Sequence, residues 1–335
     1  MKTRILPILL LALLLALVLC GCPSGDSSDT PDRSADVQEP PEAETPEEPE
    51  LGDLPDTVLP PASAPVSIVL SPTAPGKAKE ENSAATIDYS NSRDGYIMVS
   101  WRSTADSKLK VLVRGPSGST YQYNLRTDGE YEAFPLSDGN GEYTVGVYKN
   151  TSGTEYATVL TAVIDAVLTD EFAPFIRPNQ YVTYAEDNKA VQKAAELCAG
   201  ISANLDKVEA VYTYVIEHTE YDVEKAQTVQ SGYLPDIDQT LASGKGICFD
   251  YAALMAAMLR SQGVPVKLVV GYTGSAYHAW LSVYSETDGW IEGKIYFDGR
   301  AWQLMDPTFA SGAGSADAVA EYIGNGENYS AKYLY

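Results

Sequence analysis

The sequence is poor in the residues that most metal-binding and nucleic-acid-binding proteins depend on. Only 2 of its 335 residues are histidines, too few for a zinc site built from histidines. It has 23 Lys and Arg against 46 Asp and Glu, which gives a formal charge of −23 at pH 7. Such a chain does not hold nucleic acid by neutralising phosphates. We therefore expect no metal, no cofactor and no nucleic-acid partner.

The first residues have the pattern of an export signal. Lys2 and Arg4 precede a nearly unbroken apolar run at residues 5–19. The segment Leu-Cys-Gly-Cys that ends at Cys22 resembles the lipobox of bacterial lipoproteins, in which the final cysteine is acylated and becomes the new N-terminus. Cys20 fits this role less well, because the bulky Leu19 would stand at the cleavage position. An uncleaved membrane anchor is a further alternative, although the apolar run is short.

We accordingly assign residues 1–22 to a lipoprotein signal peptide, which predicts a protein anchored by lipid to the outer face of a bacterial cell membrane. Residues 23–65 are rich in Pro, Glu, Asp, Ser and Thr and contain no aromatic residue. A segment of this composition cannot bury enough apolar surface to offset its loss of entropy on ordering. We expect a disordered acidic linker there, serving as a spacer.

Residues 66–168 predict a β-sandwich domain of immunoglobulin or fibronectin type III kind. Short runs with alternating or apolar character are separated by frequent turn signals, which is typical of such sandwiches. Tyr121 and Tyr123 fall on one face of a strand, and we expect them to fill the sandwich rather than form an exposed platform for glycans. The expected strands are residues 96–101, 109–114, 120–125, 130–134, 141–149 and 155–165.

From residue 169 to residue 335 the pattern changes to α+β. Residues 190–198 and 204–218 have the apolar spacing of two amphipathic helices. His218 ends the second helix, and we interpret it as a surface histidine. The chain from residue 221 to residue 243 is expected to be a loop that leads into the next helix.

Residues 244–309 contain the candidate site. Cys248 stands just before the apolar run 251–259, which has no polar face and is therefore expected to be a buried helix ending before Gly263. The first turn of a helix has unpaired N–H groups and the positive end of the helix dipole, and both favour a thiolate over a thiol. Cys248 is thus a candidate nucleophile.

Strand-like stretches follow at residues 266–272, 278–284, 294–297 and 302–306. His278 begins the second of these strands, and Asp306, followed by a proline, ends the last one. Adjacent antiparallel strands can bring such residues side by side at the N-terminus of the helix. Cysteine, histidine and aspartate then form a candidate triad of nucleophile, base and orienting acid.

Four segments together resemble the transglutaminase-like superfamily of papain-fold cysteine enzymes. They are GKGICFDYAAL at 244–254, GVPVKLVVGY at 263–272, HAW at 278–280 and LMDPT at 304–308. The resemblance covers roughly residues 212–309 and implies Cys248 as nucleophile, His278 as general base and acid, and Asp306 as its orienting partner. No calcium site of the kind that animal transglutaminases use is visible.

A triad of this kind attacks an amide carbonyl and forms an acyl-thioester. Water as the acceptor gives a peptidase or amidase, and a lysine amine gives protein crosslinking. We expect hydrolysis, acting on protein or cell-wall peptide, with crosslinking and a non-catalytic binding or scaffold role as alternatives.

The remaining cysteine of the folded part, Cys198, lies at helical spacing from Val191, Ala194 and Ala195. We interpret it as a buried free thiol. The alternative is a disulfide with Cys248, as can form in an exported protein, and such a bond would remove the nucleophile.

Overall fold

The computed structural model describes residues 65–103, 107–274, 276–292 and 329–335. The signal peptide with Cys20 and Cys22, almost all of the linker, the last two predicted strands and Asp306 lie outside these residues. In the described part of the chain, no helix has both the length and the apolar character needed to cross a membrane.

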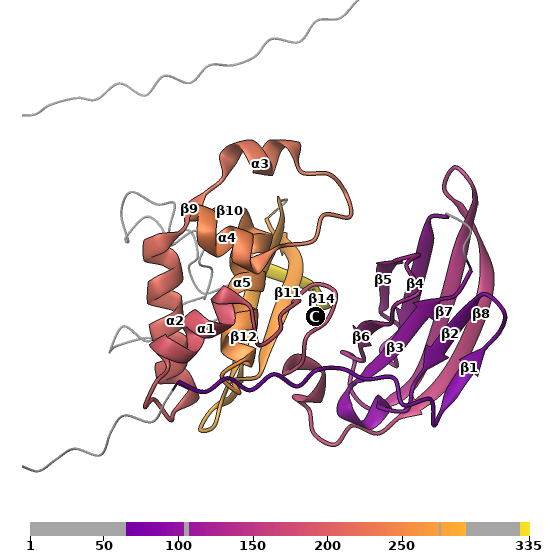
Figure 1. Ribbon diagram of the computed structural model, residues 1–335, viewed down its shortest axis with the longest axis horizontal. Coiled ribbons are helices and arrows are strands. Elements are labelled where there is room, and N and C mark those ends of the chain that lie inside the picture. Colours follow the sequence, from indigo (N-terminus) through magenta and orange to yellow (C-terminus); the bar gives the residue numbers. More distant parts are fainter. Residues whose placement is uncertain (1–64, 104–106, 275, 293–328) are drawn as a thin grey trace, which may run out of the picture. The chain divides into compact units, whose positions relative to one another are not determined.

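The strand-rich part contains two antiparallel sheets of four strands each (Figure 1). One sheet has the order β1 (Lys79–Glu81), β2 (Ala85–Asp88), β3 (Tyr96–Trp101) and β6 (Glu132–Pro135). The other has the order β5 (Thr120–Leu125), β4 (Leu109–Arg114), β7 (Gly141–Ser152) and β8 (Glu155–Ala166). All six predicted strands are present, whereas β1 and β2 were not expected. The immunoglobulin-like assignment stays a prediction.

Alternation along the strands explains this core. In β5 every second residue is buried, so Tyr121 and Tyr123 are 3% and 1% exposed. The two tyrosines therefore fill the interior, as predicted. Strand β6 begins two residues later than expected, because the Asp128 carboxylate accepts the N–H of Glu130 and holds that residue in a turn.

The part that follows contains five α-helices and a mixed set of strands in its described residues. The helices are α1 (Lys189–Leu197), α2 (Asn204–His218), α3 (Val223–Thr228), α4 (Ile237–Ser243) and α5 (Cys248–Arg260). A four-stranded sheet has the order β13 (Gly289–Ile291), β12 (Ala276–Ser285), β11 (Val266–Thr273) and β14 (Tyr329–Leu334). The two short strands β9 (Glu220–Tyr221) and β10 (Lys245–Gly246) pair in parallel.

Helix α5 is central to this part. It contacts α1, α2 and α4 and also packs on β11 and β12 (Figure 1). Every residue from Asp250 to Arg260 is buried, as the apolar run predicted. The chain turns after Arg260, and Gly263 takes a φ of +78°, which only glycine adopts without strain.

The last residue of α5 connects several chain segments. The Arg260 guanidinium is fully buried and donates hydrogen bonds to the main-chain oxygens of Val266, Arg177 and Tyr335, at 2.6–3.0 Å. Burial lowers the pKa of Arg260 to about 10, so the group stays charged at neutral pH. These bonds fix the C-terminal end of α5 to the start of β11 and to the end of β14.

The prediction of a loop between residues 221 and 243 is wrong in part, because this segment contains α3 and α4. Both are short, and each begins with an aspartate that caps its first turn. Asp222 accepts the N–H of Lys225, and Asp236 accepts the N–H groups of Asp238 and Gln239. Helices of six and seven residues present too little apolar periodicity to be recognised from sequence.

Candidate active site

Cys248 is the first residue of α5 and is partly exposed. The preceding residue, Ile247, has an extended backbone and caps the helix. The N–H groups of a first helical turn have no partner inside the helix and carry the positive end of its dipole. The structure thus places Cys248 where the sequence predicted, as a partly exposed residue at the start of a buried helix.

The chain before Cys248 is held tightly. The N–H of Glu220 donates to the oxygen of Gly244 at 2.8 Å, and the N–H of Asp222 donates to the oxygen of Gly246 at 2.9 Å. A Cβ on Gly246 would lie 2.7 Å from the Cβ of Asp250, closer than side chains approach one another. Glycine at this position therefore lets strand β10, which leads into α5, pass directly against the first turn of the helix.

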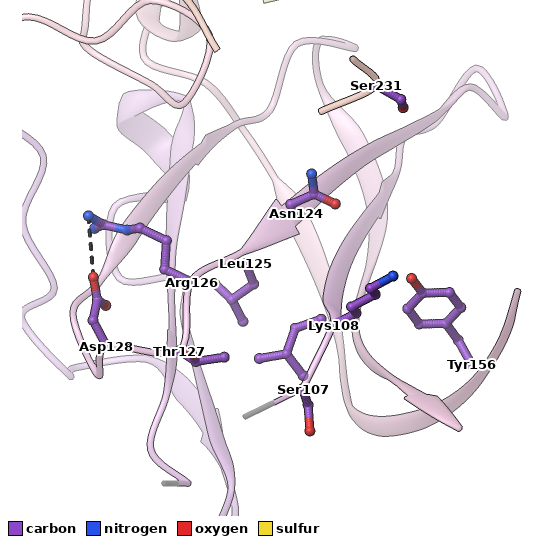
Figure 2. A pocket seen from close by; sticks show the side chains of 10 residues that line it. Ser107, Lys108, Asn124, Leu125, Arg126, Thr127, Asp128, Tyr156 and Ser231 are labelled. Carbon is purple, nitrogen blue, oxygen red and sulfur yellow. Dashed lines mark ion pairs between the residues drawn. The ribbon is translucent and has the colours of Figure 1, made fainter. Parts of the chain in front are cut away.

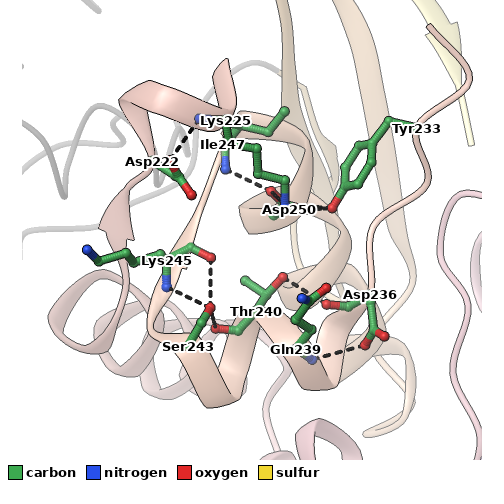
Figure 3. A network of polar contacts seen from close by, with 10 residues as sticks. All are labelled: Asp222, Lys225, Tyr233, Asp236, Gln239, Thr240, Ser243, Lys245, Ile247 and Asp250. Atoms are coloured by element: carbon green, nitrogen blue, oxygen red, sulfur yellow. Dashed lines mark hydrogen bonds and ion pairs between the residues drawn. The ribbon is translucent and has the colours of Figure 1, made fainter. Parts of the chain in front are cut away.

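Asp250, two residues after Cys248, is the centre of a polar network (Figure 3). Its side chain is fully buried, and its Oδ2 accepts the N–H of Ile247 at 2.8 Å. The Lys225 Nζ lies 2.7 Å from the same oxygen, and the Tyr233 hydroxyl donates to Oδ1 at 2.5 Å. Both carboxylate oxygens are therefore engaged, which leaves Asp250 poorly suited to orient a catalytic histidine.

His278 lies on β12, opposite Gly271 of β11, and is 7% exposed. Its ring centre is 6.3 Å from the rings of both Trp280 and Tyr329. Gly271 is required, since a Cβ there would lie 2.1 Å from the main-chain oxygen of Ser330. The close approach of β14 thus sets the surroundings of the histidine.

The structure brings together the elements that carry two of the three predicted residues. Helix α5, with Cys248, packs on β12, with His278. The direct pairing of the two side chains stays a prediction, as does the role of Asp306, which lies outside the described residues.

Aromatic side chains surround the N-terminal end of α5. The ring of Phe249 is 5.6 Å from that of Tyr181 and 6.4 Å from that of Tyr233. At the end of the β11–β12 hairpin, Tyr272 and Tyr277 are 39% and 60% exposed and stand 5.5 Å apart, edge to face.

The second cysteine of the folded part, Cys198, is buried at the end of α1, and neither it nor Cys248 forms a disulfide. Burial raises the pKa of the Cys198 thiol to about 11. This confirms the interpretation of Cys198 as a buried free thiol. His218 is exposed, with its Nδ1 2.8 Å from the oxygen of Tyr214, which confirms a surface histidine.

An open pocket of about 640 Å³ is lined mainly by residues at the ends of β4 and β5 (Figure 2). Its side chains are mostly polar, and an ion pair joins Arg126 to Asp128 at 3.4 Å. Among the described residues that line it there is no cysteine or histidine. It therefore offers no nucleophile of the kind found at α5.

Sequence reasoning missed Lys225 and Tyr233. Both lie in the segment expected to be a loop, and only the fold brings them to Asp250. One signal was available, because an aspartate directly before the apolar run of a buried helix needs a partner. The sequence does not say which residue that partner is.

Comparison with known proteins identifies a family for the segment that contains these residues. Residues 191–307 match the model of the transglutaminase-like superfamily. Kyphoscoliosis peptidase of Mus musculus is 34% identical over 120 residues, which are 35% of this chain and 18% of that protein. The uncharacterized protein YebA of Bacillus subtilis is 32% identical over 113 residues, 31% of this chain and 15% of that protein.

The chain thus spans less than a fifth of the length of these curated relatives. The crystal structure of red sea bream transglutaminase aligns over 64% of this chain and 48% of that one, at 13% identity and a TM-score of 0.25, too low to support an argument. The family match contains the segments around Cys248 and His278, and the fold places a buried helix behind the cysteine. Residues 191–307 of this chain therefore contain a transglutaminase-like domain sequence.

Proposed function

We propose that the chain is a cysteine hydrolase that cleaves amide bonds through a thioester intermediate. The observation that carries the proposal is a free, partly exposed cysteine at the first turn of a buried helix, inside a transglutaminase-like domain. The helix dipole and the free N–H groups of that turn favour the thiolate. The second free thiol, Cys198, is buried and is held protonated by its surroundings.

The proposed reaction has two steps. His278 takes the proton of the Cys248 thiol, the sulfur attacks the amide carbon, and His278 delivers that proton to the leaving amine as the carbon–nitrogen bond breaks. Water then attacks the resulting thioester, His278 accepts its proton, and the carboxylic acid and the free thiol are released. Asp306 would hold the imidazole in the tautomer that this exchange requires.

The negative oxygen that forms in each step needs hydrogen-bond donors. The N–H of Cys248 belongs to the first turn of α5 and has no partner inside the helix, so it can serve as one donor. Donors fixed in place before the reaction stabilise such an oxygen without reorganising, which is a large part of the rate in acyl transfer.

Water as the acceptor is supported by the name of the mouse relative, which is a peptidase, although this chain spans only 18% of that protein. Protein crosslinking is the second candidate, because an amine that reaches the thioester faster than water would be transferred. A scaffold role without turnover is the third.

We further propose that Cys22 is the lipid attachment site and that residues 23–65 extend the folded part away from the outer face of the cell membrane. The strand-rich part would then be an immunoglobulin-like spacer or a docking module for protein or cell-wall peptide. Mass spectrometry of the mature N-terminus tests the anchor: a lipidated Cys22 supports it, and any other first residue contradicts it.

The activity is tested by incubating the full-length chain with a pool of proteins and cell-wall peptides, with and without a labelled primary amine. Wild type is compared with Cys248→Ala and His278→Ala. Cleaved or deamidated products that require Cys248 support hydrolysis. Incorporation of the amine without cleavage would replace hydrolysis by crosslinking, and no product that depends on Cys248 would favour the scaffold role.

A further inference from the structure

A network of polar side chains lies at the first turn of α5, around Asp250. Asp250 is a fully buried carboxylate in the first turn of α5, directly before the apolar run from Tyr251 to Leu259. Burying such a charge is costly unless it is paired and hydrogen-bonded. Here it is paired with Lys225, at 2.7 Å, and hydrogen-bonded to Tyr233 and to the N–H of Ile247 (Figure 3).

Lys225 and Tyr233, the two side-chain partners of Asp250, also contact each other. The Lys225 Nζ donates to the Tyr233 hydroxyl at 2.7 Å and lies 4.5 Å from the centre of the Tyr233 ring. Burial alone lowers the pKa of Lys225, but the hydrogen bonds to Asp250 and Tyr233 outweigh it and raise the pKa above its usual value. Burial, together with the hydrogen bond to Asp250, raises the pKa of Tyr233. Lysine stays charged and tyrosine stays protonated at neutral pH.

Three separate chain segments meet in this network: α3 through Lys225, the segment before α4 through Tyr233, and the cap of α5 through Ile247. The bond from Ile247 to Asp250 fixes the backbone on both sides of Cys248. An error of about 1 Å in the position of a catalytic group can cost on the order of a hundredfold in rate. The network is therefore placed to control both the position and the charge at Cys248.

The charges act in opposite directions on a thiolate at Cys248. The Asp250 carboxylate, two residues away, repels a second negative charge, whereas the Lys225 ammonium attracts it. Because the two groups form an ion pair, their effects on the thiolate largely cancel. The positive end of the helix dipole then remains as the net electrostatic influence on Cys248, and it favours the thiolate.

We propose that Lys225, Tyr233 and Asp250 are positioning residues that fix the first turn of α5 and balance its charge so that Cys248 can react as a thiolate. The proposal rests on the proposed role of Cys248 as nucleophile. It assigns no step of the chemistry to these residues, which act through Cys248 alone.

The test is the pH dependence of Cys248 alkylation by iodoacetamide in the full-length chain, followed by peptide mass spectrometry. Lys225→Met leaves the carboxylate unbalanced and should raise the apparent pKa of Cys248 by about one unit, which slows alkylation about tenfold well below that pKa. Asp250→Asn leaves the ammonium unbalanced and should lower the apparent pKa by a similar amount.

The double variant Lys225→Met/Asp250→Asn restores balance and should return the profile to within a few tenths of a unit of wild type. Tyr233→Phe keeps both charges and should move the apparent pKa less than Lys225→Met does. Lys225→Arg should recover most of the wild-type profile. Lys193→Met is the matched control, because Lys193 is on α1 and pairs with Glu196.

Other titratable groups around this end of α5 are common to all variants, so differences between profiles report the network. They are Lys245 on β10, Glu220 and Tyr221 on β9, Asp222 before α3, Asp236 and Asp238 at α4, and Tyr277 and His278 on β12.

Opposite shifts in the two single variants support the proposal. Shifts of the same sign, or profiles that match wild type, would overturn it, because a merely structural role slows alkylation in both. If Lys225→Met does not fold, as judged by circular dichroism, Asp250→Asn and the double variant give the same decision. Failure of the proposed function is distinct: it would appear as the absence of cleaved or deamidated products that depend on Cys248, whatever the alkylation profiles show.

Discussion

Iodoacetamide should alkylate Cys248 of the full-length chain faster than Cys198 by at least about two orders of magnitude at pH 7.5. The reason lies in the two thiols' surroundings. Cys198 is 5% exposed and its pKa is raised by burial to about 11, whereas Cys248 is partly exposed at a helix N-terminus. Only the thiolate reacts, so the thiolate fraction sets the rate.

At pH 7.5 a thiol with a pKa of about 11 is ionised to roughly 3 parts in 10,000. An exposed reference thiol with a pKa of about 8.5 is ionised to roughly one tenth at this pH. Cys198 should therefore react about 300 times more slowly than such a thiol, before the steric protection of its buried side chain is counted. Cys248 is partly exposed and is not protected in this way.

The assay uses isotopically light and heavy iodoacetamide and reads each cysteine-containing peptide separately, so Cys20 and Cys22 do not interfere. The rate at Cys198 should rise about tenfold per pH unit up to about pH 10, because its thiolate fraction rises in that proportion below its pKa. Cys248→Ser is the control for peptide assignment. Equal rates at Cys198 and Cys248 at pH 7.5 would refute both the burial of Cys198 and the special position of the candidate nucleophile.

Three further outcomes follow from the fold. Leu254→Ala should lower the free energy of unfolding by about 2–5 kcal/mol in urea titrations, because the side chain is fully buried in α5. The control Val163→Ala, at a residue that is 62% exposed, should change this free energy by less than about 0.5 kcal/mol. Gly246→Ala should slow alkylation of the neighbouring thiol about tenfold or more, since the new Cβ would meet Asp250 at 2.7 Å; an unchanged rate would contradict the close packing. Limited proteolysis should cut first within residues 23–65, and a first cut inside α5 would argue against its burial.

Much of the secondary structure could be predicted from the sequence, because local patterns set it. Alternating residues in β5 and the apolar run of α5 determined which side chains would be buried, and the structure buries them. Helix α2 has the predicted bounds, with Val208, Val211, Tyr212 and Val215 buried along one face. The family was predicted as well, since four short segments in one order are a specific signal, and the family match confirms it.

Elements without a strong local pattern were missed. Strand β1 has three exposed residues, Lys79–Glu81, and shows no alternation, so only its pairing with β2 makes it a strand. Helices α3 and α4 are too short for an apolar period. Their aspartate caps, Asp222 and Asp236, were the available signals.

By itself, the sequence determined which residue is the candidate nucleophile, since the cysteine, the buried helix behind it and the family segments are all local features. Only the tertiary structure decided what surrounds that residue. Lys225 and Tyr233 are far from Asp250 along the chain, and their contacts exist because α3 and the segment before α4 fold back onto the first turn of α5. A buried carboxylate requires partners, but its sequence neighbours do not identify them, because hydrogen bonds and ion pairs depend on distance in space.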